Sequence, residues 1–202
     1  MKSGIMNLPM IIAVVVVSIL AGGLVTACGY YTPFMIFSSI IMTIGAGLLS
    51  TLDVNSGHPK WIGYQALFGI GLGLGMQQPM MVAQTALKTE DIPSGTAIVM
   101  FAQTLGGSVF VSVAQNIFQN ELLHNLQRYA PGADIVKIAG AGATMVRSVV
   151  SGPLLQEVMV AYNVAITRTF YVAVAMGALS LIGPIFVEWL SVKGKKIEVA
   201  AA

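Results

Sequence analysis

LPMIIAVVVVSILAGGLVTA, residues 8–27, contains no charged side chain. It lies inside a longer stretch, residues 3–52, without a single Asp, Glu, Lys or Arg, and three more uncharged stretches follow at residues 61–87, 92–120 and 169–187. A helix needs about 20 consecutive apolar residues to cross a hydrocarbon layer about 30 Å thick, and an ionised side chain near the centre of that layer costs several kcal/mol. The uncharged stretches therefore predict helices that span a membrane.

The composition of the whole chain points the same way. Of its 202 residues, 56% are hydrophobic and only 9% are charged, and the mean hydropathy is +0.82. Such a chain suits lipid better than water. The net charge of +2 and the lack of any run rich in Lys and Arg exclude nucleic acid as a partner. The single cysteine, Cys28, lies in no metal-ligand spacing, so the sequence predicts neither a metal nor another cofactor.

The uncharged stretches divide into five spans. The first stretch is too long for one crossing, and Gly29-Tyr30-Tyr31-Thr32-Pro33 in its middle carries a turn signal. We therefore predict an all-α, polytopic membrane helix bundle. Its first four spans, within residues 1–117, are placed at residues 8–27, 33–52, 61–87 and 93–117, and the last span at residues 169–190.

The longest connection, residues 118–168, is predicted to be a non-cytosolic loop with an amphipathic helix, because apolar residues recur there at helical spacing. They are Leu154, Leu155, Val158, Met159, Ala161, Tyr162 and Ala165. Lys193, Lys195 and Lys196 follow the last span, and lysines close to a membrane end favour the cytosolic side. Residues 191–202 are accordingly predicted to be a cytosolic tail. A raw count of Lys and Arg favours the opposite orientation, but long loops carry little weight in this rule.

Glycines in the third span are spaced for close helix packing. Gly69 with Gly73, and Gly71 with Gly75, form two offset pairs of small residues four apart, and Gly106 and Gly107 of the fourth span are assigned the same role. The run superficially resembles a nucleotide-binding loop, but it lacks the third glycine of that fingerprint. Pro79 and Pro184 each remove a backbone hydrogen bond inside a span and are predicted hinges.

Polar side chains inside two spans are the candidates for a solute path. Gln77 and Gln84 share one face of the third span, and Gln103 and Thr104 lie on a polar side of the fourth span. Such groups must face protein or a water-filled cavity. Two interpretations stay open: hydrogen bonds between helices, or the lining of a path. None of the five spans has a carboxylate, His or Lys near its midpoint, where ion coupling usually needs one.

Several short strings resemble one known family. They are Lys2-Ser3-Gly4 with Asn7-Leu8-Pro9, Ala21-Gly22-Gly23, residues 29–33, Trp61-Ile62-Gly63-Tyr64-Gln65, residues 69–79 ending in Gln77-Gln78-Pro79, and Phe101-Ala102-Gln103-Thr104-Leu105-Gly106-Gly107-Ser108. Together they look like the C-terminal part of fungal major facilitator superfamily efflux pumps, in the branch of fourteen-helix drug:proton antiporters.

The resemblance implies a function and a set of partners. It implies a plasma-membrane transporter that exports drugs or fungal secondary metabolites, with a lipid bilayer, a small amphipathic or apolar solute and protons as partners. The chain would supply the last five helices and would need a missing N-terminal half, so it is not expected to transport alone. Two rivals remain: a non-transporting membrane interaction protein that binds partner helices through its glycine faces, and an intramembrane enzyme that uses His124 or Glu121.

Overall fold

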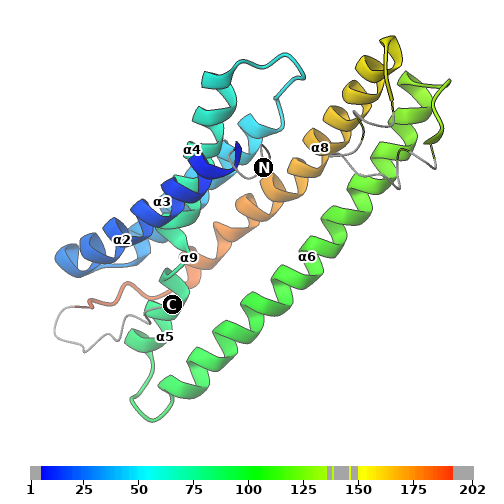
Figure 1. Cartoon of the computed structure of the whole chain (residues 1–202). Helices are drawn as coiled ribbons and strands as arrows, with labels where there is room; N and C mark the ends of the chain where they lie inside the picture. The colour runs from blue at the N-terminus through cyan, green and yellow to red at the C-terminus, as the bar shows by residue number, and fades with distance from the viewer. Residues whose placement is uncertain (1–5, 136–137, 139–145, 147–149, 193–202) are drawn as a thin grey trace.

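The computed structural model describes residues 6–135, 138, 146 and 150–192, and its fold is all-α (Figure 1). The helices are α2 Leu8–Cys28, α3 Thr32–Leu49, α4 His58–Gly75, α5 Gln78–Ala86, α6 Ile92–Tyr129, α8 Pro153–Ser180 and α9 Ile182–Phe186. Taken together with their continuations, they give 5 helical stretches in the described residues that are long and apolar enough to cross a membrane. The predicted fold class is thus confirmed.

Prolines and one glycine set where the helices begin and end. Six of these helices carry Pro at their first or second position, where the missing N–H would have had no partner within the helix. Helix α2 ends at Gly29, whose φ of 89° is in the left-handed region and whose N–H donates to the carbonyl of Val25 at 2.7 Å. The turn that the sequence predicted at residues 29–33 therefore separates α2 from α3.

The helices pack side by side in a fixed order. Helix α4 packs against both α2 and α3, α8 packs against α3 on one side and α6 on the other, and α5 contacts the start of α6 (Figure 1). Helices α2 and α6 lie at the two edges of this order, and none of the residues in the most apolar 18-residue window of α6 is buried. One long side of α6 therefore faces away from the rest of the chain.

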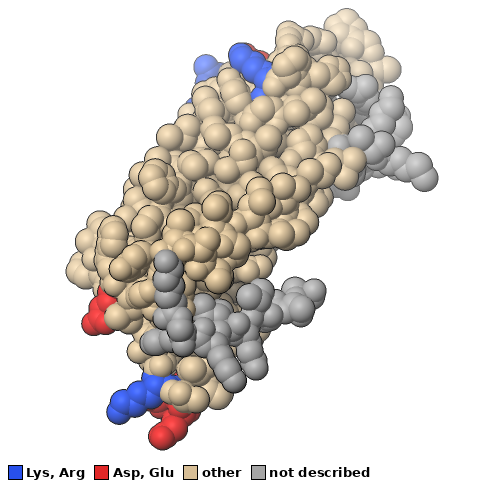
Figure 2. All heavy atoms as spheres, turned by 90° about the vertical axis from the view of Figure 1, so that its left-hand side faces the viewer, with Lys and Arg blue, Asp and Glu red and all other residues tan. Residues whose placement is uncertain are grey.

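Charged side chains gather at the two ends of the bundle. Figure 2 shows one face of the molecule, with Lys, Arg, Asp and Glu at its two ends and an uncharged surface between them. At one end lie the α5–α6 turn, with Lys88, Glu90 and Asp91, and the carboxyl end of α9. An uncharged belt between two charged rims is the surface expected of a protein that crosses a bilayer.

Helix α6 is longer than the sequence predicted. Helix α6 continues to Tyr129 rather than ending near residue 117, whereas α8 begins at Pro153 and joins the predicted amphipathic helix directly to the last span. At 38 residues α6 is about 57 Å long, well beyond the thickness of a hydrocarbon layer. The gain of charge after residue 120 does not end a helix; α6 stops only at Ala130, which precedes Pro131 and has a non-helical φ of −135°.

The ends of the two helices share a core of their own, which we call the α6–α8 extension (residues 118–135 and 150–165). Its buried members within these ranges are Leu122, Leu126, Ala130, Val150, Val158, Ala161, Tyr162 and Ala165, and Ile138 and Val146 complete the cluster. Four of the apolar positions that we predicted for an amphipathic helix are among them. Much of the stretch predicted as a loop is therefore a packed pair of helix ends.

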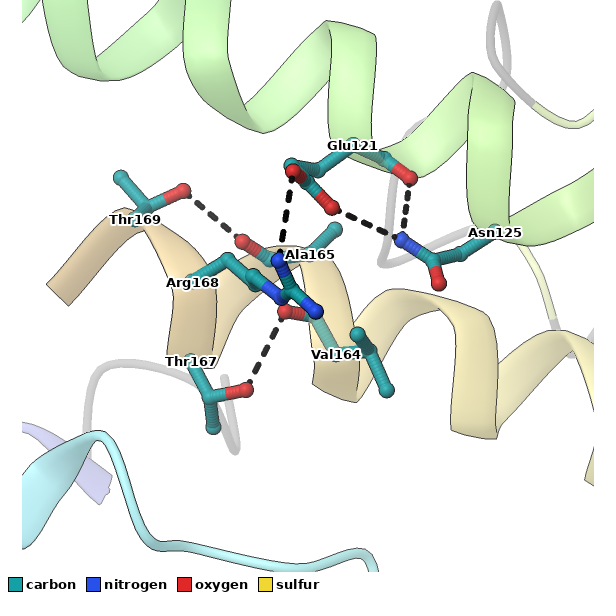
Figure 3. A network of polar contacts seen from close by, with 7 residues as sticks. All are labelled: Glu121, Asn125, Val164, Ala165, Thr167, Arg168 and Thr169. Atoms are coloured by element: carbon teal, nitrogen blue, oxygen red, sulfur yellow. Dashed lines mark hydrogen bonds and ion pairs between the residues drawn. The ribbon is translucent and has the colours of Figure 1, made fainter. Parts of the chain in front are cut away.

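A polar contact marks the base of this extension (Figure 3). Arg168 of α8 lies 4.0 Å from the carboxylate of Glu121 of α6, and the side-chain amide of Asn125 donates to the same carboxylate at 3.1 Å. The pair is partly exposed, so its contribution to stability is small. It places opposite charges together where the uncharged parts of α6 and α8 end.

At the other end, a C-terminal strap, residues 187–192, crosses the turn between α2 and α3. The hydroxyl of Tyr31 donates to the carbonyl of Glu188 at 2.7 Å, and the N–H of Val192 donates to the carbonyl of Gly29 at 2.9 Å. Tyr31 is fully buried and Val192 nearly so. Only Ser191 and Val192 of the predicted cytosolic tail belong to the described residues; Lys193, Lys195 and Lys196 lie outside them.

The contact between Tyr31 and the strap should make the stability of the chain depend on pH in the alkaline range. Burial raises the pKa of the Tyr31 phenol above its ordinary value of 10.0; a hydrogen bond with the backbone of Leu190 lowers this pKa in part, and the charge of Glu188 raises it by a smaller amount. A raised pKa favours the protonated, folded form up to the ordinary pKa, and this contribution is lost as the pH rises through the folded pKa. We expect the native chain to lose stability above about pH 10 more steeply than Tyr31→Phe does.

The comparison is made by unfolding both proteins in mixed detergent micelles and following helix content by circular dichroism at each pH. Below about pH 9, Tyr31→Phe should be less stable by about 1 kcal/mol, because the carbonyl of Glu188 loses its donor. The neighbouring, 45% exposed Tyr30 supplies the control variant Tyr30→Phe, which should match the native chain. Identical pH profiles for all three proteins would contradict the prediction.

Candidate functional site

Two interrupted helices meet in one half of the bundle. The hydrogen bonding of the third predicted span is interrupted at Met76 and Gln77, between α4 and α5, because Pro79 cannot donate to the carbonyl of Gly75, while the backbone of both residues stays in the right-handed helical region. The last span breaks at Leu181, between α8 and α9, and Pro184 cannot donate to the carbonyl of Ser180. Both predicted hinge prolines thus lie beside a break, while movement at either break stays a prediction.

A cavity of about 480 Å³ lies between these breaks. Its walls come from α3, the α4–α5 break, the first third of α6 and the α8–α9 break. The lining residues are Met35, Ser38, Ser39, Met42, Leu72, Gly75, Met76, Pro79, Val99, Ala102, Gln103, Ser180, Gly183 and Pro184. No ionisable side chain is among them, so this site suits an uncharged molecule.

The serine hydroxyls of the cavity are already hydrogen-bonded. Ser38 donates to the carbonyl of Gly71 at 2.7 Å, while Ser180 lies 2.8 Å from the hydroxyl of Ser39 and 2.7 Å from the carbonyl of Gly177. The amide of Gln103, by contrast, has no hydrogen-bond partner within the described part of the chain. Gln103 is therefore the side chain of this cavity that is available to a ligand.

The four candidate path residues do not share one pocket. Gln103 lines the cavity, whereas Gln77 lines a separate groove of about 610 Å³ along α2. Gln84 is half-buried in α5, and Thr104 is exposed on α6. Further helices would be needed to enclose all four in one path, so their common role stays a prediction.

The polar face of α6 is satisfied within its own helix. Thr104, Ser108 and Ser112 each donate to the carbonyl four residues earlier at 2.9 Å, and Asn116 does the same through its amide. The sequence left two interpretations open: hydrogen bonds between helices, or the lining of a path. In the described structure, these side chains form no hydrogen bonds between helices. Because the single hydroxyl donors of Thr104, Ser108 and Ser112 are occupied, these three groups can face an apolar neighbour at little cost.

The glycine pairs of α4 lie against two different helices. A methyl group added at Gly69 would lie 2.6 Å from the carbonyl oxygen of Met10, and Gly73 is equally close to α2. On the other side, Gly71 lies against the backbone of α3 at Met42, and Gly75 lies against the side chain of Ser38. Offset glycines thus let α4 approach both neighbours at once.

The glycines of α6 are in a different setting. A methyl group added at Gly106 or Gly107 would meet nothing within 4 Å. In the described structure they pack against no other helix, so a packing role requires helices other than those seen here. It stays a prediction.

Sequence reasoning missed several polar residues. Ser39 and Ser180, which join α3 to α8 across the cavity, were not among the candidate residues. Gln78 is only 1% exposed; its amide donates to the carbonyl of Leu74 at 2.9 Å, and its buried side-chain oxygen has no partner in the part of the chain that the structure describes. A serine four residues before Pro184 is a signal that could have drawn attention to Ser180.

Known proteins similar to this chain are fungal transporters. The MFS-type transporter astH of Aspergillus oryzae is 55% identical over 97% of the chain, which spans 35% of that protein. By sequence, this chain is similar to fungal MFS-type transporters over nearly all of its own length. The efflux pump roqT of Penicillium rubens is 56% identical over 95% of the chain, and the MFS-type efflux pump MFS1 of Arthroderma benhamiae is 50% identical over the whole length of this chain.

These similarities have a defined extent. The chain spans about a third of the length of the curated relatives it matches, 36% of roqT and 38% of MFS1. No family model matches it, and no solved structure matches it. The resemblance to fungal MFS-type transporters that the sequence strings predicted is confirmed. So is the prediction of a helical chain embedded in a membrane. The relatives are transporters rather than enzymes, as predicted.

Proposed function

We propose that this chain forms five helices of one half of a fungal efflux transporter, which exports small amphipathic or apolar molecules such as drugs or secondary metabolites. Its identity of 50–56% to fungal transporters and efflux pumps, over nearly all its length, is the observation that carries the proposal. In facilitator folds the solute site lies between two halves of the protein. The chain would therefore act together with helices equivalent to the remainder of its relatives.

The side chains of this chain suit it to solute binding rather than to proton coupling. The uncharged cavity and the groove with Gln77 suit an uncharged or weakly polar solute. The described spans hold no carboxylate near their midpoints, so proton coupling would be supplied by the other half. We place Gln77, Gln84, Gln103 and Thr104 along the solute path, the C-terminus in the cytosol and the transporter in the plasma membrane.

The breaks would let the path change shape. Alternating access in such transporters uses the rocking of packed helices around a central site. Gly75 with Pro79, and Pro184, interrupt backbone hydrogen bonding where two helices line one cavity. Bending at these points would need fewer broken hydrogen bonds than bending elsewhere in α4 or α8.

Reconstitution tests the proposal. We expect liposomes with this chain alone to show no efflux of rhodamine 6G driven by a proton gradient, and liposomes that also contain the remaining part of roqT to show it. Gln103→Ala should lower that rate by about fivefold, as for the loss of one hydrogen bond, whereas Gln119→Ala, on an exposed part of α6, should not.

Two results would overturn the proposal. One is gradient-driven efflux by the chain alone. The other is stable binding of the roqT part without any solute movement, which would favour the membrane interaction protein instead. The exposed side of α6 is the surface that such a membrane interaction protein would use to bind partner helices.

A further inference from the structure

We propose that the cavity between the two helix breaks binds an uncharged, largely apolar molecule that carries a single hydroxyl group and enters from the membrane. The proposal rests on the membrane setting of the proposed function, but it does not require transport. It concerns a site built within this chain alone, apart from the groove that holds Gln77.

The size and walls of the cavity fit a small molecule. Its volume of about 480 Å³ falls in the range of ligand pockets, about 300–1,000 Å³. Leu72 and Val99 provide branched apolar surface, and Met35 and Met42 provide flexible thioethers that adapt to the shape of a ligand. Charged molecules are excluded, because no ionisable group lines the cavity to pair with them.

Two residues of the cavity wall lack the backbone donor that a helix normally supplies to their carbonyls. Pro79 and Pro184 withhold the usual backbone donor from the carbonyls of Gly75 and Ser180, and both of these residues line the cavity. Gly75 has no side chain, so its contribution to the wall is backbone. In a membrane, water is scarce and an unpaired carbonyl costs several kcal/mol. A hydroxyl donor on the ligand would satisfy one of these carbonyls.

The side chains limit how polar the ligand can be. The hydroxyls of Ser38, Ser39 and Ser180 are already engaged within the protein. Gln103 alone offers a free amide, which can accept from or donate to the same hydroxyl. A ligand with many polar groups would leave most of them unpaired, whereas a ligand with one hydroxyl leaves none.

Photolabelling tests the site directly. The chain is placed in lipid nanodiscs and labelled with azioctanol, an aliphatic alcohol with a photoreactive group, or with azioctane, which lacks the hydroxyl. Adducts are then assigned by mass spectrometry. We expect saturable azioctanol adducts on cavity residues such as Met35 and Val99, and about fivefold weaker binding of azioctane, the effect of one hydrogen bond.

Two variants of α6 make the assignment specific. Ala102→Trp projects into the cavity from an exposed position and should abolish these adducts, whereas Val111→Trp, at a residue that is 70% exposed and away from the cavity, should not. Gln103→Leu should reduce the preference for azioctanol over azioctane. Because both substituted cavity positions are exposed, the buried helix contacts should be retained, and unchanged circular dichroism verifies this.

The proposal is overturned if the adducts do not saturate and spread evenly over the outer faces of α2 and α6, which is the pattern of molecules dissolved in lipid. It is equally overturned if Ala102→Trp leaves the cavity adducts unchanged, or if azioctane labels them as well as azioctanol. None of these measurements involves transport, so a failure of the efflux experiment would leave this result intact.

Discussion

Gly71→Ala is expected to lower the free energy of unfolding by about 1–3 kcal/mol, the usual cost of forcing a methyl group into a packed interface. The added methyl group would lie 2.7 Å from the Cα atom of Met42, closer than two carbon atoms can approach without movement. Since backbone rather than a flexible side chain is in the way, α3 and α4 must separate. The loss is measured by unfolding in mixed micelles of dodecyl maltoside and sodium dodecyl sulfate.

Gly63→Ala is the matched control, because Gly63 lies on the same helix and an added methyl group there meets nothing within 4 Å. Alanine is the better helix former by about 0.5–1 kcal/mol, so this variant should be as stable as the native chain or slightly more stable. Gly69→Ala, where the obstacle is the backbone of α2, should resemble Gly71→Ala. Equal stabilities of Gly63→Ala and Gly71→Ala would refute the close packing of α4.

The spans could be predicted from the sequence because a helix inside lipid must be apolar and nearly free of charge over about 20 residues. The absence of charge over residues 3–52 could be translated into two helices once the turn at Gly29 was recognised, and the structure has α2 and α3 on either side of it. The same rule says nothing about where a helix ends after it leaves the membrane. For this reason α6 was predicted to stop near residue 117, although nothing in the sequence breaks the helix before Pro131.

The cavity was harder to predict than the spans. Pro79 and Pro184 could each be identified as interruptions, but only the packing of α8 against α3 brings the two breaks to one cavity. Likewise Gln77 and Gln103 look equivalent in the sequence, since both are amides in apolar surroundings. They line different surfaces because Gln77 lies on the groove along α2, whereas its neighbour Met76 lines the cavity together with Gln103. Which polar residues meet is decided by contacts between helices, which periodicity does not encode.

Leu126→Ala is expected to destabilise the α6–α8 extension by about 2–5 kcal/mol, the cost of removing a large side chain from a core. Leu126 is fully buried in the cluster that joins the two helix ends. If this extension lies in water, beyond the pair formed by Glu121 and Arg168, the full hydrophobic effect stabilises it. Inside lipid, the same truncation would lose packing but no such driving force.

Amide hydrogen exchange in nanodiscs separates these two cases. Leu126→Ala should accelerate exchange at residues 122–129 and 153–165 while α2, α3 and α4 keep their protection, because the extension has its own core. Leu123→Ala, three residues earlier on the same helix and 41% exposed, is the control and should change little. Slow exchange in both variants would place the extension in the lipid, whereas equal acceleration in both would mean that the cluster around Leu126 is not the source of its stability.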